Sequence, residues 1–590
     1  MKLLCAGVWL AFFAGSTATL TASPVTFNRD IAPILYDNCA SCHHPGESAP
    51  FSLLTYQDAK AHARQIVAVT KSRFMPPWLP EPGDFHFADE RRLTAEQIRT
   101  LAQWVADGVP EGDPRERRAT PHFDNGWQLG PPDLVLKAKR PYSLPPSGSD
   151  TYWNFILPVP VEGERWVKAI EIRPGDKRLV HHANIMLDRL ESARAMEKVP
   201  GAGFAGMELR VESEAFDPDS HFLFWKPGSV PKFQPDDMAL RISKGTDLLL
   251  NMHLQPSGKP ESIQPSIGLY FTDRPAKLRP MLLQMENDAA LKIPAGNREF
   301  VVTDTFTLPI AVDLLAIYPH AHYLGRDLLA TASLPDGTTK TLIHIKRWDL
   351  NWQGVFGYAE PVVLPSGTTI RMKYSYDNSA ANAANPHHPP QLVSGGNRAE
   401  DEMAHLWLQV LPHEDRTSGS DGRLALQEAL SRHQAEQDPG NFEAQYNLAA
   451  MLLNRGDSKG ALTYYVKAAS LRPNDFVVLN ALGTAQLTNG NLQAAIDKFR
   501  SAIHTRSDYF DAHYNLGLAL GLEGDFKGAE SEFRESARLK PEDANAHANL
   551  GAALGQVGDL VHAKEELRTA LKLDPDNKLA RENLSALDGK

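Results

Sequence analysis

Cysteine is scarce in this chain, with 3 copies among 590 residues. Cys5 lies in an apolar N-terminal segment, so Cys39 and Cys42 are the two thiols left further along. No second cysteine pair exists to complete a four-cysteine zinc site. Disulfides cannot brace the long middle of the chain, so packing must hold its core.

An excess of positive charge is also missing. Lys and Arg number 61 against 72 Asp and Glu, which gives a net charge of -11. This balance argues against a nucleic-acid or anionic-membrane partner. Beyond the N-terminus no apolar run approaches eighteen residues, the length expected of a membrane span. A glycine-rich phosphate loop and helix crossovers between strands are lacking as well, so a nucleotide-binding fold is not expected.

The N-terminal segment 1–23 has the pattern of a secretory signal peptide. One lysine precedes an apolar run from Leu3 to Gly15, and small polar residues follow where a peptidase could cut. The run is too short to span a bilayer comfortably. We therefore expect an exported protein of the bacterial periplasm or the extracellular space, with no membrane span in the mature chain.

The stretch "CASCHHPG" carries the C-x-x-C-H motif by which c-type haem is attached. Thioether bonds from Cys39 and Cys42 would anchor the porphyrin, and His43 would supply the proximal iron ligand. A disulfide or half of a zinc site remains the alternative.

Amphipathic helices are expected on both sides of this motif, in "FNRDIAPILYDN" and "LTAEQIRTLAQWVADG". Between them Met75 precedes two prolines in a loop, which favours a second axial iron ligand over a core side chain. A His/Met pair raises the reduction potential and suits electron transfer. Residues 25–113 thus resemble a class I cytochrome c, which implies one covalently bound haem.

The C-terminal part repeats with a period of 34 residues, which is the signature of tetratricopeptide (TPR) helix-turn-helix units. We expect a linker over 413–423 and an all-α solenoid over 424–590, with four repeats from about 440. Such solenoids present a concave face to a protein partner; a spacer or dimerisation module is the alternative. The glycines that keep the period are Gly456, Gly490, Gly524 and Gly558.

The middle of the chain reads as β-structure. Runs such as "RWVKAIEIRP" and "TTIRMKYSYDN" recur between clusters of Pro, Gly, Asn and Asp, as expected of β-sandwiches. Its size suits two sandwiches, which we place at 126–275 and 280–412. The whole chain is therefore expected to be multidomain, with a small α-helical N-terminal part, two jelly-roll-like sandwiches and an α-solenoid.

Histidines are scattered over these expected strands. The H-x-H pair in "YPHAHYLG" is weak by itself, because 21 histidines in 590 residues predict roughly one such pair by chance. Other candidate metal ligands join it from "LVHHANIML", "LLNMHLQPSG" and "AEDEMAHLWLQV". The full set is His181, His182, His253, His320, His322 and Met403.

In this order, the six residues resemble the copper type II, ascorbate-dependent monooxygenases, the family that includes dopamine β-monooxygenase and peptidylglycine α-hydroxylating monooxygenase. The resemblance covers roughly 126–412. It implies two copper ions on two linked sandwiches. An electron-transferring copper is assigned to His181, His182 and His253, and the oxygen-binding, catalytic copper to His320, His322 and Met403.

The donor types are consistent with copper. Three imidazoles suit it, and a His₂Met set is too soft for calcium or magnesium and poor for zinc. With both later cysteines used for haem, copper centres that need a thiolate are excluded. Adjacent His181 and His182 point to opposite faces of a regular strand, so their joint ligation requires a bulge or a strand end.

The expected activity is hydroxylation of a C–H bond of an organic substrate with O₂. Its two electrons would arrive singly from an ascorbate-like donor or a redox protein, by way of the haem and the first copper. Tyr318 stands where the peptide-amidating branch has an arginine, so a peptidylglycine substrate is not expected. The alternative is a non-catalytic electron carrier or copper-binding scaffold that docks partners through its TPRs.

Overall fold

The computed structural model describes residues 23–123, 126–148, 150–189, 191–206, 221–413 and 421–588. The expected signal peptide lies outside these residues except for Ser23, and so does most of the expected linker. The chain divides into two compact units. One comprises Met1–Trp78 and Arg91–Gly126, and the other comprises Leu79–Glu90 and Trp127–Lys590.

The first unit is helical. Thr55 and Thr94 each begin a helix with a capping box, in which the threonine hydroxyl and an acidic or amide side chain satisfy the first backbone N–H groups. Phe27, Leu101 and Trp104 are fully or almost fully buried in its core. The helical elements are η1 (Phe27–Ile31), α1 (Ala32–Asn38), α2 (Tyr56–Ala61), α3 (Ala63–Lys71), α4 (Ala95–Ala106) and η2 (Pro114–Glu116).

The segment Leu79–Glu90 interrupts the first unit in sequence but packs with the second. The backbone of Ala88 donates to Gly357, and that of Ala359 donates to His86, both at 2.9 Å. These bonds lie beside an isolated bridge between Phe87 and Tyr358. The segment therefore adds to the edge of strand β18 (Phe356–Leu364), although the sequence alone grouped it with the N-terminal domain.

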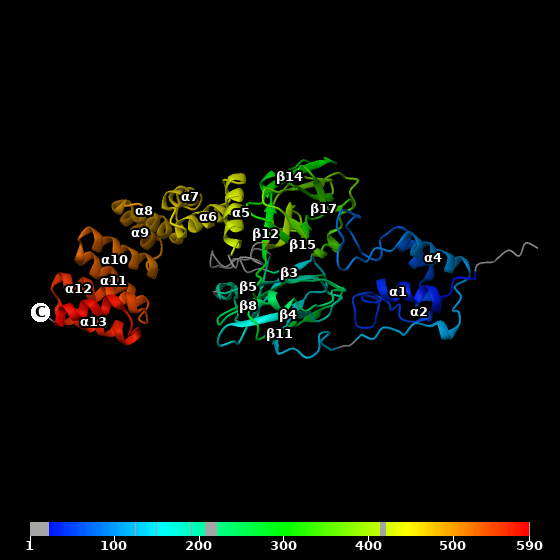
Figure 1. Ribbon diagram of the computed structural model, residues 1–590, viewed down its shortest axis with the longest axis horizontal. Coiled ribbons are helices and arrows are strands. Elements are labelled where there is room, and N and C mark those ends of the chain that lie inside the picture. The colour runs from blue at the N-terminus through cyan, green and yellow to red at the C-terminus, as the bar shows by residue number, and fades with distance from the viewer. Residues whose placement is uncertain are drawn as a thin grey trace, which may run out of the picture. The chain divides into compact units, whose positions relative to one another are not determined.

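The middle region is β-rich, as predicted, and its first half is a pair of antiparallel sheets (Figure 1). One has the order β1-β11-β4-β8 and the other β6-β3-β9-β5-β7. Apolar side chains from both sheets form one core, to which one face of β9 contributes. The other face of β9 is buried as well, with Leu249 in a separate small cluster. The strands are β1 (Leu134–Lys137), β2 (Tyr142–Leu144), β3 (Thr151–Pro158), β4 (Arg165–Arg173), β5 (Val180–Asp188), β6 (Phe204–Ala205), β7 (Phe224–Trp225), β8 (Leu240–Ile242), β9 (Asp247–Leu254), β10 (Glu261–Ile263) and β11 (Ser266–Thr272).

The second half of the middle region repeats this plan with the sheets β12-β21-β15-β18 and β14-β19-β16-β17. Burial alternates along β14 and β19, as expected of strands with one face inward. The strands are β12 (Met281–Glu286), β13 (Lys292–Ile293), β14 (Phe300–Thr307), β15 (Val312–His320), β16 (Gly325–Ser333), β17 (Thr339–Ile345), β18, β19 (Thr369–Tyr376), β20 (Val393–Ser394) and β21 (His405–Pro412).

The C-terminal region is all α-helical and built from helix pairs, which confirms the predicted repeats. Its first helix packs against the second sandwich, where His433 contacts Asp304 at 2.9 Å. No helix of the described residues is long and apolar enough to cross a bilayer. The helices are α5 (Arg423–Gln437), α6 (Phe442–Asn454), α7 (Ser458–Leu471), α8 (Phe476–Thr488), α9 (Leu492–Thr505), α10 (Phe510–Glu523), α11 (Phe526–Leu539), α12 (Ala544–Val557), α13 (Leu560–Leu573) and α14 (Lys578–Asp588).

Two glycines of α10 give a matched test of repeat packing. A Cβ at Gly517 would lie 2.8 Å from the Phe533 ring, whereas a Cβ at Gly521 meets nothing within 4 Å. We expect Gly517→Ala to destabilise the repeats by about 1–3 kcal/mol through overpacking. Gly521→Ala should stabilise them by about 0.5–1 kcal/mol because alanine loses less backbone entropy. Urea unfolding followed by helical circular dichroism measures both, and shifts of equal sign would contradict this packing.

Candidate metal centres

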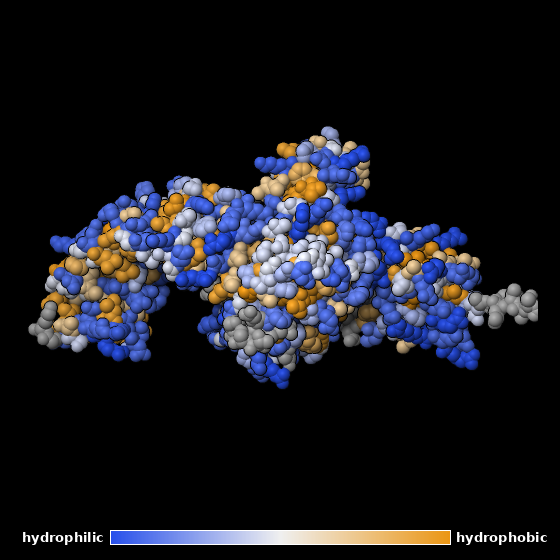
Figure 2. Space-filling model, turned by 45° about the horizontal axis from the view of Figure 1, so that its top comes forward, coloured by the Kyte–Doolittle hydropathy of each residue, from blue (hydrophilic) through white to orange (hydrophobic). Residues whose placement is uncertain are grey.

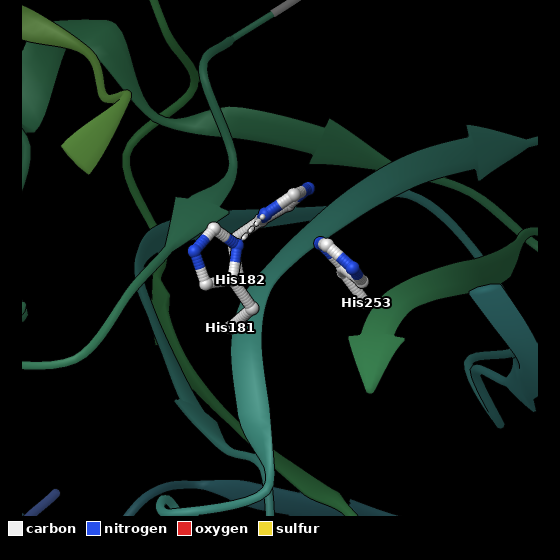
Figure 3. Close-up of side chains that lie close together, drawn as sticks. All are labelled: His181, His182 and His253. Atoms are coloured by element: carbon white, nitrogen blue, oxygen red, sulfur yellow. Dashed lines mark hydrogen bonds between the residues drawn. The ribbon is translucent and has the colours of Figure 1, made fainter. Parts of the chain in front are cut away.

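Three of the predicted ligands, His181, His182 and His253, lie together in the first sandwich (Figure 3). Each offers a donor atom, and these atoms all lie within 4.8 Å of one another. Within the described ranges, this is the one group of at least three His, Cys, Asp or Glu that meets this criterion.

A β-bulge brings the two adjacent histidines together. Strand β5 pairs with β9, and the register shifts between Val180 and His182, so His181 is the extra residue. His182 then lies directly opposite His253. A bulge turns a side chain away from the regular alternation of a strand. The Nδ1 atoms of His181 and His182 are consequently 3.1 Å apart, and the requirement recognised in the sequence is met.

His253 is oriented by a carboxylate. Its Nε2 lies 2.9 Å from Asp150 Oδ2, which also accepts from the Gln255 amide at 3.2 Å. A carboxylate partner fixes the tautomer with the proton on Nε2, which leaves the Nδ1 lone pair for an ion. That Nδ1 is buried and has no hydrogen-bond partner among the described residues. The ring also stacks on Tyr152, with centroids 4.5 Å apart.

Two imidazoles of this group, His181 and His182, are held in the neutral form that binds metals. Burial, followed by the proximity of His253, lowers the pKa of His181 to about 4. The same two causes lower the pKa of His182 well below its usual range. An orphaned buried nitrogen on His253, beside two imidazoles whose pKa values are lowered, fits a borderline or soft ion such as copper.

The second predicted group lies in the second sandwich. His320 ends β15, and His322 follows two residues later, with ring centroids 5.2 Å apart. The Nδ1 of His320 donates to the Gln353 side-chain oxygen at 2.8 Å, and that of His322 donates to the Asp401 carbonyl at 2.9 Å. Both rings therefore leave the lone pair of Nε2 available to bind a metal ion. Burial is the first cause that lowers the pKa of each ring.

Met403 is buried and directly follows Glu402. The Glu402 side chain connects the chain segment of His322 to the segment of Met403. One Glu402 oxygen accepts from the backbone N–H of His322 and of Met403, and the other accepts from Leu324 at 2.9 Å. Burial raises the pKa of Glu402 to about 8. The carboxyl thus holds the turn that carries His322 beside the start of β21.

His405 lies near this group without being one of its predicted ligands. It pairs with His320 in the register of β15 and β21, with ring centroids 6.3 Å apart. Its Nε2 contacts Asp288 Oδ2 at 2.9 Å. Burial lowers its pKa, but the hydrogen bond to Asp288 and the charges of Asp288 and Glu286 together outweigh burial, so the net pKa is raised.

The first unit contains the predicted haem residues. Cys39 and Cys42 are free thiols in the turn after α1. His43 Nδ1 donates to the Phe51 carbonyl at 3.0 Å, which leaves Nε2 as the available iron ligand. Met75 follows α3, and its backbone donates to Val69 at 3.2 Å. The His43 contact fits the predicted attachment motif, whereas the Met75 contact places only its backbone.

Comparison with known proteins bears on the C-terminal region. The tetratricopeptide repeat family matches residues 418–476, 480–544 and 544–577. No curated protein matches the chain. Similar solved structures include YrrB, described as a TPR protein with an unusual peptide-binding site. YrrB is 22% identical, the match covers 27% of this chain and 83% of that chain, and the TM-score is 0.25.

The other similar structures are of MamA. One is 25% identical over 28% of this chain and 87% of that chain, with a TM-score of 0.25. Another, MamA 41-end from Desulfovibrio magneticus RS-1, is 22% identical over 27% of this chain and 89% of that chain, also with a TM-score of 0.25. The family match identifies the C-terminal region as a set of tetratricopeptide repeats, which are typical docking modules for proteins.

Several residues of the two groups were not identified from the sequence. Asp150, Gln353 and Glu402 each contact a predicted ligand from a distant part of the chain. Of these three, only Glu402 is next to a predicted ligand in the sequence, because it directly precedes Met403 in "AEDEM". The other two contacts depend on the completed fold.

Glu402 offers a test of this arrangement in metal-free protein. Glu402→Ala would leave three buried N–H groups without their acceptor, so we expect a loss of at least about 2 kcal/mol in the stability of the second sandwich. The exposed Glu400 is the control, and Glu400→Ala should change stability by less than about 0.5 kcal/mol. Chemical denaturation followed by tryptophan fluorescence measures both. Equal effects of the two substitutions would contradict the role given to Glu402.

Proposed function

We propose that this protein is an exported copper- and haem-containing monooxygenase that hydroxylates a C–H bond with O₂. The observation that carries the proposal is the buried group of His181, His182 and His253, with the unpartnered Nδ1 of His253. A buried polar atom without a partner is costly, and an ion at this position would remove the cost.

The second group supports the oxygen-binding role. His320 and His322 keep Nε2 free, and the chain around Glu402 brings the thioether residue Met403 to the same sandwich. A thioether favours the reduced ion that reacts with O₂. The overall reaction takes O₂, two electrons and two protons, converts C–H to C–OH and releases water.

The haem domain would supply these electrons one at a time. Covalent fusion keeps the donor at a high effective concentration near the copper sites. An ascorbate-like compound or a redox protein would reduce the haem.

Tyr318 narrows the substrate class. Its side chain is half-buried, and its hydroxyl donates to the Gln353 side chain at 2.5 Å. A neutral phenol in this position provides no charge to hold a substrate carboxylate. The substrate is therefore proposed to be an organic compound other than a peptide with a C-terminal glycine.

The second candidate is a non-catalytic electron carrier or copper-binding scaffold that docks partners through its repeats. The tetratricopeptide family match supports the docking part of this candidate. Figure 2 shows apolar residues exposed among hydrophilic ones on the helical repeats, at the left of the view. Exposed apolar side chains in this region include Val466, Leu522 and Val561, which suit contact with a protein partner.

Metal analysis of protein matured with haem tests the proposed cofactors. We expect two copper ions and one iron per chain, because the donor sets form two copper groups and one haem site. His253→Ala should lose one copper. His344→Ala is the control, since His344 contacts Asp327 instead of either group, and it should keep both. A His253→Ala variant with full copper content would contradict the assignment of the first site.

Oxygen consumption separates the two candidates. The enzyme should consume O₂ only with both reductant and substrate, and Met403→Ile should abolish this while keeping the first copper. A scaffold would consume none with any reductant.

The electron route has a test of its own. Met75→Ala removes the proposed axial ligand, lowers the haem potential and should slow the reduction of copper by an external cytochrome donor. Copper content should stay unchanged, which serves as the internal control. Stopped-flow spectroscopy measures the rate, and reduction at the wild-type rate would refute the relay.

A further inference from the structure

Gln353 lies between the two histidine groups. It follows the short turn η6 (Leu350–Trp352) of the second sandwich, and only 2% of its surface is exposed. A buried amide has two donors and an acceptor to satisfy. Here the two ends of the amide reach different histidine groups.

The oxygen end of the amide serves the second group. Gln353 Oε1 accepts from the Tyr318 hydroxyl at 2.5 Å and from His320 Nδ1 at 2.8 Å. Because Nδ1 of His320 must carry a proton to donate, this bond fixes the tautomer whose Nε2 is free. Gln353 thus orients one proposed ligand of the second site.

The nitrogen end of the amide reaches the first group. Gln353 Nε2 lies 3.5 Å from His182 Nδ1, the atom that also lies 3.1 Å from His181 Nδ1. Two nitrogens bound to one ion at about 2.0 Å each are separated by roughly 3 Å. The lone pair that accepts from Gln353 is therefore the one that an ion at the first site would take.

The main chain holds Gln353 in this position. Lys226, which follows β7 of the first sandwich, donates its Nζ to the carbonyls of Gln353 at 3.1 Å and Trp352 at 3.4 Å. Asn351 and Asp349 of the same turn also lie near enough to His181 to affect its pKa. The turn from Asp349 to Gln353 therefore covers the first group.

We propose that Gln353 is a positioning residue that couples the two metal sites, because its amide orients His320 and competes with an ion for the lone pair of His182. This inference rests on the proposed function. An ion at the first site displaces the Gln353 N–H from His182 and leaves the amide held by its oxygen alone. The amide and the His320 ring bonded to it then shift together, so binding at the first site changes the orientation of His320, and the effect on affinity is reciprocal.

Substitutions of Gln353 should shift the two affinities in opposite directions. Gln353→Leu removes the N–H that competes with an ion for the lone pair of His182. It also removes the oxygen that accepts from His320. We therefore expect Cu(I) affinity to rise about two- to tenfold at the first site and to fall by a similar factor at the second, the effect of one hydrogen bond. Gln353→Glu still accepts from His320 but donates nothing to His182, so it should strengthen the first site and leave the second unchanged.

Competition titration with a chromogenic Cu(I) chelator measures each site alone. A His322→Ala background isolates the first site, and a His253→Ala background isolates the second. Gln264→Leu is the matched control, since its amide donates to the Ala138 carbonyl at 2.9 Å, away from both groups, and it should change neither affinity.

The outcomes separate this inference from the proposed function. Opposite shifts in Gln353→Leu, with the split seen in Gln353→Glu, support the coupling. If the wild-type chain binds two coppers but both affinities fall together or stay unchanged in Gln353→Leu, the coupling is refuted and the two sites stand. A wild-type chain that binds no copper contradicts both.

Discussion

The candidate chemistry of this protein depends on one irregularity in a β-ladder. The extra residue at His181 shifts the register of β5 against β9 and lets two consecutive imidazoles approach to 3.1 Å. In a regular strand they would point to opposite faces. The bulge therefore converts an ordinary strand pair into a three-nitrogen group with His253, while β5 stays paired with β9 on both sides of it.

The buried polar residues around both histidine groups orient the proposed metal ligands. Asp150, Gln353 and Glu402 fix the imidazoles or the turn that holds them, and each reaches its partner from another part of the chain. Burial lowers the pKa of the rings whose shift is resolved, and these contacts decide which nitrogen is free. A metal site needs this outer layer as much as its ligands, because loosely held donors bind weakly.

The sequence predicted a β-rich middle and a C-terminal repeat region, because each has a local pattern. The 34-residue spacing of Gly456 to Gly558 predicted the repeats, and strand-like runs between clusters of Pro, Gly, Asn and Asp predicted the β-rich middle. The sequence could state that His181 and His182 need a bulge but not that one forms. Asp150 and Gln353 were missed because their contacts span 103 and 171 residues. The packing of Leu79–Glu90 on β18 has the same long-range origin.

The central claim is that one ion binds where the bulge brings three imidazoles together. Anomalous X-ray scattering at the copper edge, recorded from crystals of copper-loaded full-length protein, tests it most directly. The account predicts a copper peak within about 2.0–2.1 Å of one nitrogen each of His181, His182 and His253, the usual length of a bond from imidazole to a transition metal. Copper bound elsewhere, with these three rings unliganded, would contradict it.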